Sequence, residues 1–273
     1  MHCETIRLKD HYDCLAGGVL KILCLEEPLD VASDWVRPMV IVVPGGGYRF
    51  VSKREGEPIA ADFLAKGYHA CVLEYLCEPQ GVRYPEQLKE LACAVDYLKK
   101  NAARLFVNSD EVFAVGFSAG GHLVADYAVE YATLSERFDA PLETGVKAVG
   151  LCYPVINDHE ESFESLLHGY PDEEKSELKE NLKVNRRVTE STPPTFLWTT
   201  ATDKTVPAQN TLRYALALAQ NGVPYELHVY PKGSHGAANG SVELNKEDDS
   251  LPVLSSWTKD MARFFRGFCQ EKY

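Results

Sequence analysis

The run Gly116-Phe117-Ser118-Ala119-Gly120 has the pattern G-x-S-x-G, and it lies between a strand-like run and a helix-like segment. That context is typical of a nucleophile elbow, a strand-to-helix turn that exposes a serine above a sheet. The turn is so tight that the residues two before and two after the serine must lack bulk, and both are glycine here. The pattern predicts Ser118 as a nucleophile and the backbone N–H of Ala119 as an oxyanion donor, supported by the positive end of the helix. A purely structural turn is the alternative.

Two later residues complete the chemistry that such a serine needs. A serine hydroxyl needs a base to take its proton, and an elbow serine is followed along the chain by an acid and then a histidine. Asp203 follows the strand-like run 195–200, and His235 follows the run 225–230. Loops at the carboxyl ends of parallel strands share one sheet edge, so we expect both near Ser118. Taken singly, Asp203 could cap the next helix and His235 could be a solvated loop residue.

A third segment could stabilise a developing negative charge. Pro44-Gly45-Gly46-Gly47-Tyr48 follows the apolar run 39–43. Glycines let the backbone approach a reacting carbonyl and aim N–H groups at it, although a flexible turn would look the same. A phosphate-binding loop is excluded because G-x-x-x-x-G-K-[ST] is absent, and the dinucleotide fingerprint lacks its last glycine.

The elements that must position these residues alternate along the chain. Apolar runs typical of buried strands alternate with amphipathic segments typical of helices, which predicts an α/β protein with a mainly parallel central sheet and helices on both faces. The run 18–25 could be an antiparallel edge strand. We expect one domain over residues 1–273. The strand-like runs are 39–43, 70–75, 112–115, 148–153, 195–200 and 225–230, and the helix-like segments are 57–66, 85–100, 122–131, 212–220 and 257–268.

Residues 156–194 break this alternation. Between Asn157 and Glu180 the segment has nine acidic residues against two lysines, and it looks poor in helix. We expect a lid-like insertion over the carboxyl ends of the strands, or equally a solvated surface excursion. Residues 236–253 form a second polar loop.

Composition narrows the possible partners. The net charge of −12, from 28 basic and 40 acidic residues, argues against nucleic acid. The sequence contains no apolar stretch of about 18 residues, so we expect no membrane span. Its first residues do not combine a basic start with an apolar run, so we expect no signal peptide. The eight cysteines form no C-x-x-C pair, which favours free thiols in a reducing cytoplasm over disulfides or zinc. No histidine spacing fits a metal site.

Taken together, these segments resemble the α/β-hydrolases, and more narrowly the esterase branch related to hormone-sensitive lipase and its acetyl-xylan-esterase-like, sugar-ester hydrolase subgroup. The likeness spans about residues 20–268. The resemblance implies a fold in which Ser118 is the nucleophile, Asp203 the triad acid and His235 the general base, with Gly46, Gly47 and Ala119 as oxyanion donors. The segments that carry it are 43–48, 54–60, 116–122, 192–198, Asp203 with 206–207, and 232–236.

One position departs from the wider branch, where the glycine loop reads H-G-G-G. Pro44 stands where that histidine helps to hold the loop. Proline fixes its own φ but offers no side-chain hydrogen bond. This departure points to the sugar-ester-like subgroup.

The resemblance also implies the reaction: hydrolysis of short-chain carboxylic esters, acetyl esters above all, of sugars or other small alcohols, with no metal or organic cofactor. Tyr48, Arg49 and Arg54 are the candidate substrate-binding residues by position, although for any one of them a plain surface role, such as a salt bridge between Arg54 and a nearby glutamate, is the favoured interpretation. His122 is expected to pack beneath the elbow. A peptidase or amidase on the same scaffold, or a non-catalytic binding protein, stays open, as does a homo-oligomer.

Overall fold

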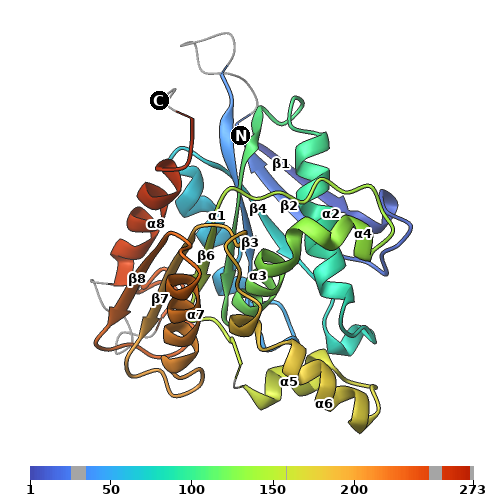
Figure 1. Cartoon of the computed structure of the whole chain (residues 1–273). Helices are drawn as coiled ribbons and strands as arrows, with labels where there is room; N and C mark the ends of the chain where they lie inside the picture. The colour runs from blue at the N-terminus through green and yellow to red at the C-terminus, as the bar shows by residue number, and fades with distance from the viewer. Residues whose placement is uncertain (26–34, 158, 246–253, 271–273) are drawn as a thin grey trace.

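The computed structural model describes residues 1–25, 35–157, 159–245 and 254–270. Within these ranges eight strands form one sheet in the order β1-β2-β4-β3-β5-β6-β7-β8 (Figure 1). β1 and β2 pair antiparallel, as do β2 and β4, and every other neighbouring pair is parallel. The strands are β1 (His2–Arg7), β2 (Val19–Cys24), β3 (Arg37–Val43), β4 (His69–Glu74), β5 (Val107–Phe117), β6 (Val149–Cys152), β7 (Thr195–Thr200) and β8 (Tyr225–Tyr230).

The central strands are apolar because both of their faces are buried. In β3, Met39, Ile41 and Val43 point into one core cluster, whereas Val40 and Val42 point into the other. Successive side chains on a strand alternate between faces, so a continuous apolar run fills both layers. This geometry confirms the predicted α/β architecture with a mainly parallel sheet.

Helices cover both faces of the sheet. Helices α1 and α8 pack together on one face, and α2, α3 and α7 cover the other (Figure 1). In the described part of the chain, no helix is long and apolar enough to cross a membrane. The helices of the main fold are α1 (Glu57–Leu64), α2 (Glu86–Lys100), α3 (Ser118–Glu130), the short α4 (Leu134–Arg137), α7 (Gln209–Gln220) and α8 (Trp257–Arg266).

Part of the sheet was not predicted from the sequence. The segment expected as an edge strand is β2, which is antiparallel to its neighbours, but β1 lies outside it and forms the true edge. In β1 only Ile6 is buried, so the sequence of this strand lacks the apolar run that would have predicted it. β5 begins at Val107, five residues before the predicted start. The sequence did not reveal this part of the strand, because residues 108–111 are polar.

The prediction that residues 156–194 are poor in helix was wrong. This segment contains α5 (Glu160–Leu166) and α6 (Asp172–Asn181), which lie side by side beyond the sheet in Figure 1. Helix α6 has no buried residue, so apolar periodicity could not reveal it. It is stabilised by acidic residues in its first turn and by ion pairs from Lys175 and Lys179 to α5. The two lysines beside Glu164 lower the pKa of that carboxyl to about 2.

A buried carboxyl on α2 makes stability depend on pH. Glu90 is 0% exposed, and burial raises its pKa to about 8, with Glu86 adding to the rise and the hydrogen bond from the Leu76 N–H opposing it. Between the ordinary value of 4.5 and the folded value, the folded state holds a proton that the unfolded state has lost. Stability from this group therefore falls as pH rises through that interval.

We predict that Glu90→Gln, which is neutral at every pH and keeps an acceptor for Leu76, loses less stability than the wild type between about pH 5 and pH 9. Thermal unfolding monitored at intervals across that range measures the difference. The exposed Glu190→Gln is the control and should follow the wild-type curve. Parallel curves for Glu90→Gln and the wild type would contradict the prediction.

Candidate active site

Ser118 lies at a strained turn between β5 and α3. Its φ is +53°, in the left-handed region that a residue with a side chain rarely adopts. The predicted need for glycine on both sides is confirmed: a Cβ on Gly116 would lie 2.3 Å from the Gly120 carbonyl oxygen, and one on Gly120 would lie 2.2 Å from the Val43 oxygen. Ser118 is the first residue of α3, so its hydroxyl stands beside the helix N-terminus.

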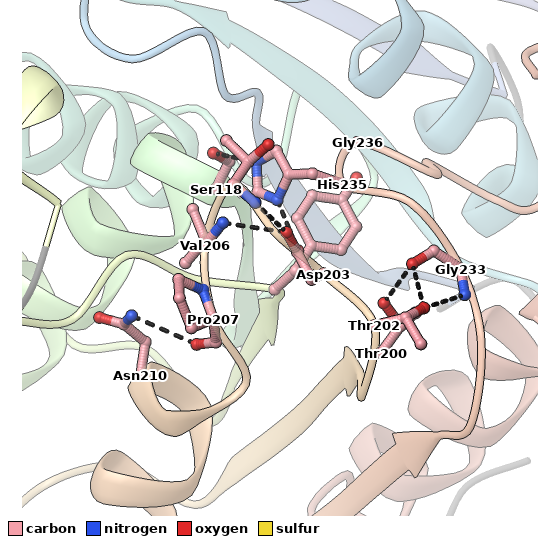
Figure 2. A network of polar contacts seen from close by, with 12 residues as sticks. Ser118, Thr200, Thr202, Asp203, Val206, Pro207, Asn210, Gly233, His235 and Gly236 are labelled. Atoms are coloured by element: carbon pink, nitrogen blue, oxygen red, sulfur yellow. Dashed lines mark hydrogen bonds and ion pairs between the residues drawn. The ribbon is translucent and has the colours of Figure 1, made fainter.

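His235 and Asp203 extend from Ser118 as a continuous hydrogen-bonded chain (Figure 2). The Ser118 Oγ lies 2.8 Å from His235 Nε2, and His235 Nδ1 lies 2.7 Å from Asp203 Oδ2. Because a carboxylate accepts only, Nδ1 carries the proton and Nε2 is the acceptor that faces the serine. The arrangement can remove the proton from the Ser118 hydroxyl as it attacks.

Backbone groups hold the acid in place. The other oxygen of Asp203 accepts hydrogen bonds of 2.9 Å from the backbone N–H groups of Thr205 and Val206. The Asp203 side chain is 1% exposed, whereas the His235 side chain is 17% exposed. The carboxylate is thus fixed and desolvated, while the imidazole keeps an opening toward solvent.

The loop that carries His235 is tied to the end of β7 (Figure 2). The carbonyl of Gly233 accepts hydrogen bonds from the hydroxyls of Thr200 and Thr202, at 2.7 and 3.0 Å. Gly233 has a φ of +150°, and a Cβ there would lie 2.7 Å from the Thr200 side chain, so the close approach requires glycine. The strand ends therefore position His235 as well as Asp203.

The glycine loop lies against the elbow. Gly46 and Gly47 have φ values of +126° and +64°, and a Cβ on Gly46 would lie 1.9 Å from the Phe50 carbonyl oxygen. Within the described ranges, no protein group accepts a hydrogen bond from the N–H of Gly46 or Gly47. The Ala119 N–H belongs to the first turn of α3, where helix N–H groups have no partner in the helix. These three groups can donate to an oxyanion.

The structure places the candidate pocket residues in three different settings. Tyr48 is 1% exposed and its hydroxyl bonds to His122 Nδ1, so its side chain belongs to the core and not to an open pocket. Arg49 is exposed and pairs with Glu161 of α5. Arg54 donates to the Gly236 carbonyl and to Asn245, so it ties down the loop after the base. The sequence could not reveal these settings, because each partner lies far away along the chain.

His122 lies beneath the elbow, as expected. It is 1% exposed, and its Nε2 lies 2.9 Å from the Leu182 carbonyl oxygen. A carbonyl only accepts, so Nε2 carries the proton and Nδ1 accepts from the Tyr48 hydroxyl. Burial lowers the His122 pKa to about 4, so the ring stays neutral and connects the glycine loop to the insertion.

Two further residues lie near the site: Glu55, which the sequence placed in the loop before the first helix as a pocket candidate, and Tyr153, whose role the sequence did not predict. Glu55 is 4% exposed, and it accepts hydrogen bonds from the Gly45 N–H and the Tyr153 hydroxyl. Tyr153 packs its ring edge-on to the His235 ring, with centroids 5.0 Å apart. The polar sequence around Glu55 gave no sign that its carboxyl is buried.

In the described part of the chain, no three His, Cys, Asp or Glu side chains gather in a way that could hold a metal ion.

Curated relatives match most of this chain but only part of their own length. The chain is 32% identical to endo-1,4-beta-xylanase B of Butyrivibrio fibrisolvens over 74% of its own length and 33% of that protein. It is 29% identical to an acetylxylan esterase of Xylanibacter ruminicola over 81% of its length and 45% of that protein. The chain thus spans less than half of either relative.

Solved structures match over almost the whole chain. An acetyl ester-xyloside bifunctional hydrolase from Caldicellulosiruptor lactoaceticus is 31% identical with a TM-score of 0.83, covering 98% of this chain and 97% of that one. A carboxylesterase from Lactobacillus plantarum is 29% identical with a TM-score of 0.82, covering 98% of each chain.

The chain also matches a model of a protein family. The model named BD-FAE matches residues 29–218, which is more than half of the chain and includes the glycine loop, the elbow and Asp203. The resemblance seen in the sequence is thereby confirmed. This chain has the α/β-hydrolase fold and belongs to the BD-FAE family.

Proposed function

We propose that this protein hydrolyses short-chain carboxylic esters of sugars or other small alcohols through an acyl-enzyme on Ser118. The observation that carries the proposal is the hydrogen-bonded chain from Ser118 through His235 to Asp203, with distances of 2.8 and 2.7 Å. The glycine loop packs against Ser118, and within the described part of the chain the N–H groups of its Gly46 and Gly47 have no protein acceptor. A nucleophile, a base and an oxyanion site in one place are the requirements of acyl transfer.

In the first half of the reaction, the Ser118 oxygen attacks the ester carbonyl carbon while His235 Nε2 takes the hydroxyl proton. The carbonyl oxygen becomes an oxyanion, which accepts hydrogen bonds from the N–H groups of Gly46, Gly47 and Ala119. The bond to the alcohol oxygen then breaks. His235 gives its proton to that oxygen, and the alcohol leaves with the acyl group on Ser118.

In the second half, His235 takes a proton from water, and the resulting hydroxide oxygen attacks the acyl carbon. The tetrahedral intermediate collapses, the Ser118 oxygen leaves, and His235 returns the proton to it. The Asp203 carboxylate stabilises the imidazolium in both halves. Every proton moves between Ser118, His235, substrate and water, so the proposed cycle needs no cofactor.

The substrate class rests on the relatives and on the surroundings of the glycine loop. The relatives include an acetylxylan esterase and an acetyl ester-xyloside hydrolase. Helix α5 packs close to the loop, since a Cβ on Gly47 would lie 3.8 Å from the Ser162 hydroxyl. We propose that this insertion acts as a fixed lid-like wall that favours acetyl over long acyl chains. The net charge of −12 disfavours anionic substrates.

The cysteines bear on the compartment. All eight are free thiols, and Cys3 and Cys14 are exposed. Exposed thiols persist in reducing surroundings, so we propose a cytoplasmic location. A homo-oligomer stays a prediction.

We predict that a fluorophosphonate probe labels the wild type, because Ser118 attacks phosphorus and displaces fluoride while His235 takes the proton. Ser118→Ala should abolish labelling and lower kcat for p-nitrophenyl acetate by about 10⁴-fold or more. Ser176→Ala, on the exposed helix α6, is the matched control and should keep both signals. A wild type that the probe does not label would favour a non-catalytic binding protein.

We predict that Asp203→Asn folds normally but lowers kcat by about 10⁴-fold. The amide oxygen can still accept from the Thr205 and Val206 N–H groups, so the loop is retained. Its NH₂ group would donate to His235 Nδ1, which moves the proton to Nε2 and removes the acceptor for Ser118. Steady-state kinetics and melting temperature are measured together. Activity within tenfold of the wild type would show that His235 does not depend on this carboxylate.

We predict that p-nitrophenyl acetate has the highest kcat/KM in a series of acyl chains from C2 to C12, because α5 lies close to the glycine loop. Acetylated xylo-oligosaccharides should release acetate, which an enzyme-coupled assay detects. Highest turnover at C8 or longer would contradict the acetyl preference while leaving the esterase proposal intact.

A further inference from the structure

Glu55 is a buried carboxyl that the mechanism above does not use. It ends the short helical turn Lys53–Glu55, and it is 4% exposed. One carboxyl oxygen accepts the Gly45 N–H at 2.9 Å, and the other accepts the Tyr153 hydroxyl at 2.7 Å. Among the residues that the structure describes, no lysine or arginine pairs with it. Burial of a carboxyl without a cationic partner is costly, so its two hydrogen bonds need an explanation.

The first bond holds the glycine loop against the nucleophile. A Cβ on Gly45 would lie 2.8 Å from the Ser118 Cβ and 2.9 Å from the Glu55 oxygen, so Gly45 is packed between these two side chains. The Gly45 N–H is taken by Glu55 and is not available to substrate. The donors of Gly46 and Gly47 follow directly, so their position relative to Ser118 depends on this bond.

The second bond leads to the loop of the base. The Tyr153 hydroxyl donates to Glu55 and accepts the Ala238 N–H at 3.1 Å, three residues after His235. The same ring packs edge-on to His235, with centroids 5.0 Å apart. Neighbouring Arg54 donates to the Gly236 carbonyl at 2.8 Å. One short turn thus contacts both the glycine loop and the base loop.

The chemistry of the two partners explains why a carboxyl occupies this position. Both the Gly45 N–H and the Tyr153 hydroxyl donate to Glu55, and the tyrosine oxygen also accepts from the Ala238 N–H. A carboxylate offers two acceptor oxygens, whereas a glutamine offers one acceptor and one donor. A glutamine oxygen could accept from the Gly45 N–H, but its NH₂ group would then face Tyr153 and leave the tyrosine hydroxyl proton without its acceptor.

We propose that Glu55 is a positioning residue that sets the oxyanion donors and the base in register about Ser118. The inference rests on the proposed esterase function. It predicts a loss of transition-state stabilisation without a loss of substrate binding, because Glu55 is buried and both of its oxygens are occupied by protein donors. A residue that only supported the fold would instead lower the amount of active enzyme.

The test compares Glu55→Gln, Tyr153→Phe and the double variant with Glu57→Gln as control. Glu57 is an exposed carboxylate two residues away that pairs with Lys21. Fluorophosphonate titration counts active sites, so kcat is expressed per folded, competent molecule. Glu55→Gln should lower kcat for p-nitrophenyl acetate by about 10- to 100-fold, less than the loss of a whole oxyanion donor. KM should stay within about threefold, and Glu57→Gln should match the wild type.

The remaining variants separate the outcomes. Tyr153→Phe keeps the Gly45 bond and should lower kcat by about 3- to 10-fold, and it carries the test if Glu55→Gln does not fold. The double variant should lose less than the product of the two single losses, because both act through one network. A per-site kcat within twofold of the wild type for Glu55→Gln, or for Tyr153→Phe where it stands in, would overturn the inference. A failure of the proposed function would be seen separately, because the Ser118→Ala variant would then be as active as the wild type.

Discussion

The site depends on how closely three backbone segments approach one another. Ser118 adopts a φ of +53°, Gly120 lies where any Cβ would be 2.2 Å from the Val43 oxygen, and Gly116 lies where a Cβ would be 2.3 Å from the Gly120 oxygen. The end of β3, the end of β5 and the start of α3 thus meet without room for a methyl group. This contact brings the glycine loop and Ser118 together, and it makes the two glycine-rich segments 44–47 and 116–121 one structural unit.

Residues from many parts of the chain hold that unit in its strained form. Asp203 is fixed by two backbone N–H groups, and the base loop is fixed by threonine hydroxyls at the end of β7. His122 joins the Tyr48 hydroxyl to the insertion at Leu182. The strain at Ser118 persists because the surrounding packing over-determines it. The insertion is therefore part of the support of the site as well as its neighbour.

The sequence predicted Ser118 and Asp203 because each follows a strand whose apolar pattern is strong, and it predicted His235 because this residue follows the alternating run of β8. Strand order then brings the three residues to one sheet edge, and no long-range information is needed. The direction of the Tyr48 side chain could not be predicted in this way. Its position after the glycine loop suggested that it lines the pocket, but its ring is buried against His122. Whether a loop side chain turns inward depends on a partner far along the chain. Helix α6 was missed for a related reason, since charge pairs and not an apolar face stabilise it.

The hydrogen bonds that hold the glycine loop also explain why position 44 can be proline. In the wider branch that the sequence resembles, a histidine side chain helps to hold the glycine loop. Here the Pro44 carbonyl accepts a 2.9 Å hydrogen bond from the Tyr75 hydroxyl, and the next N–H, that of Gly45, is held by Glu55. Both contacts use main-chain groups of the loop, so the side chain at position 44 is free to be proline. Proline also fixes its own φ, which removes backbone freedom from the unfolded chain at the first residue of the loop. The loop is thus held through its main-chain groups, and the positions of Gly46 and Gly47 do not depend on a side chain such as the histidine of the wider branch.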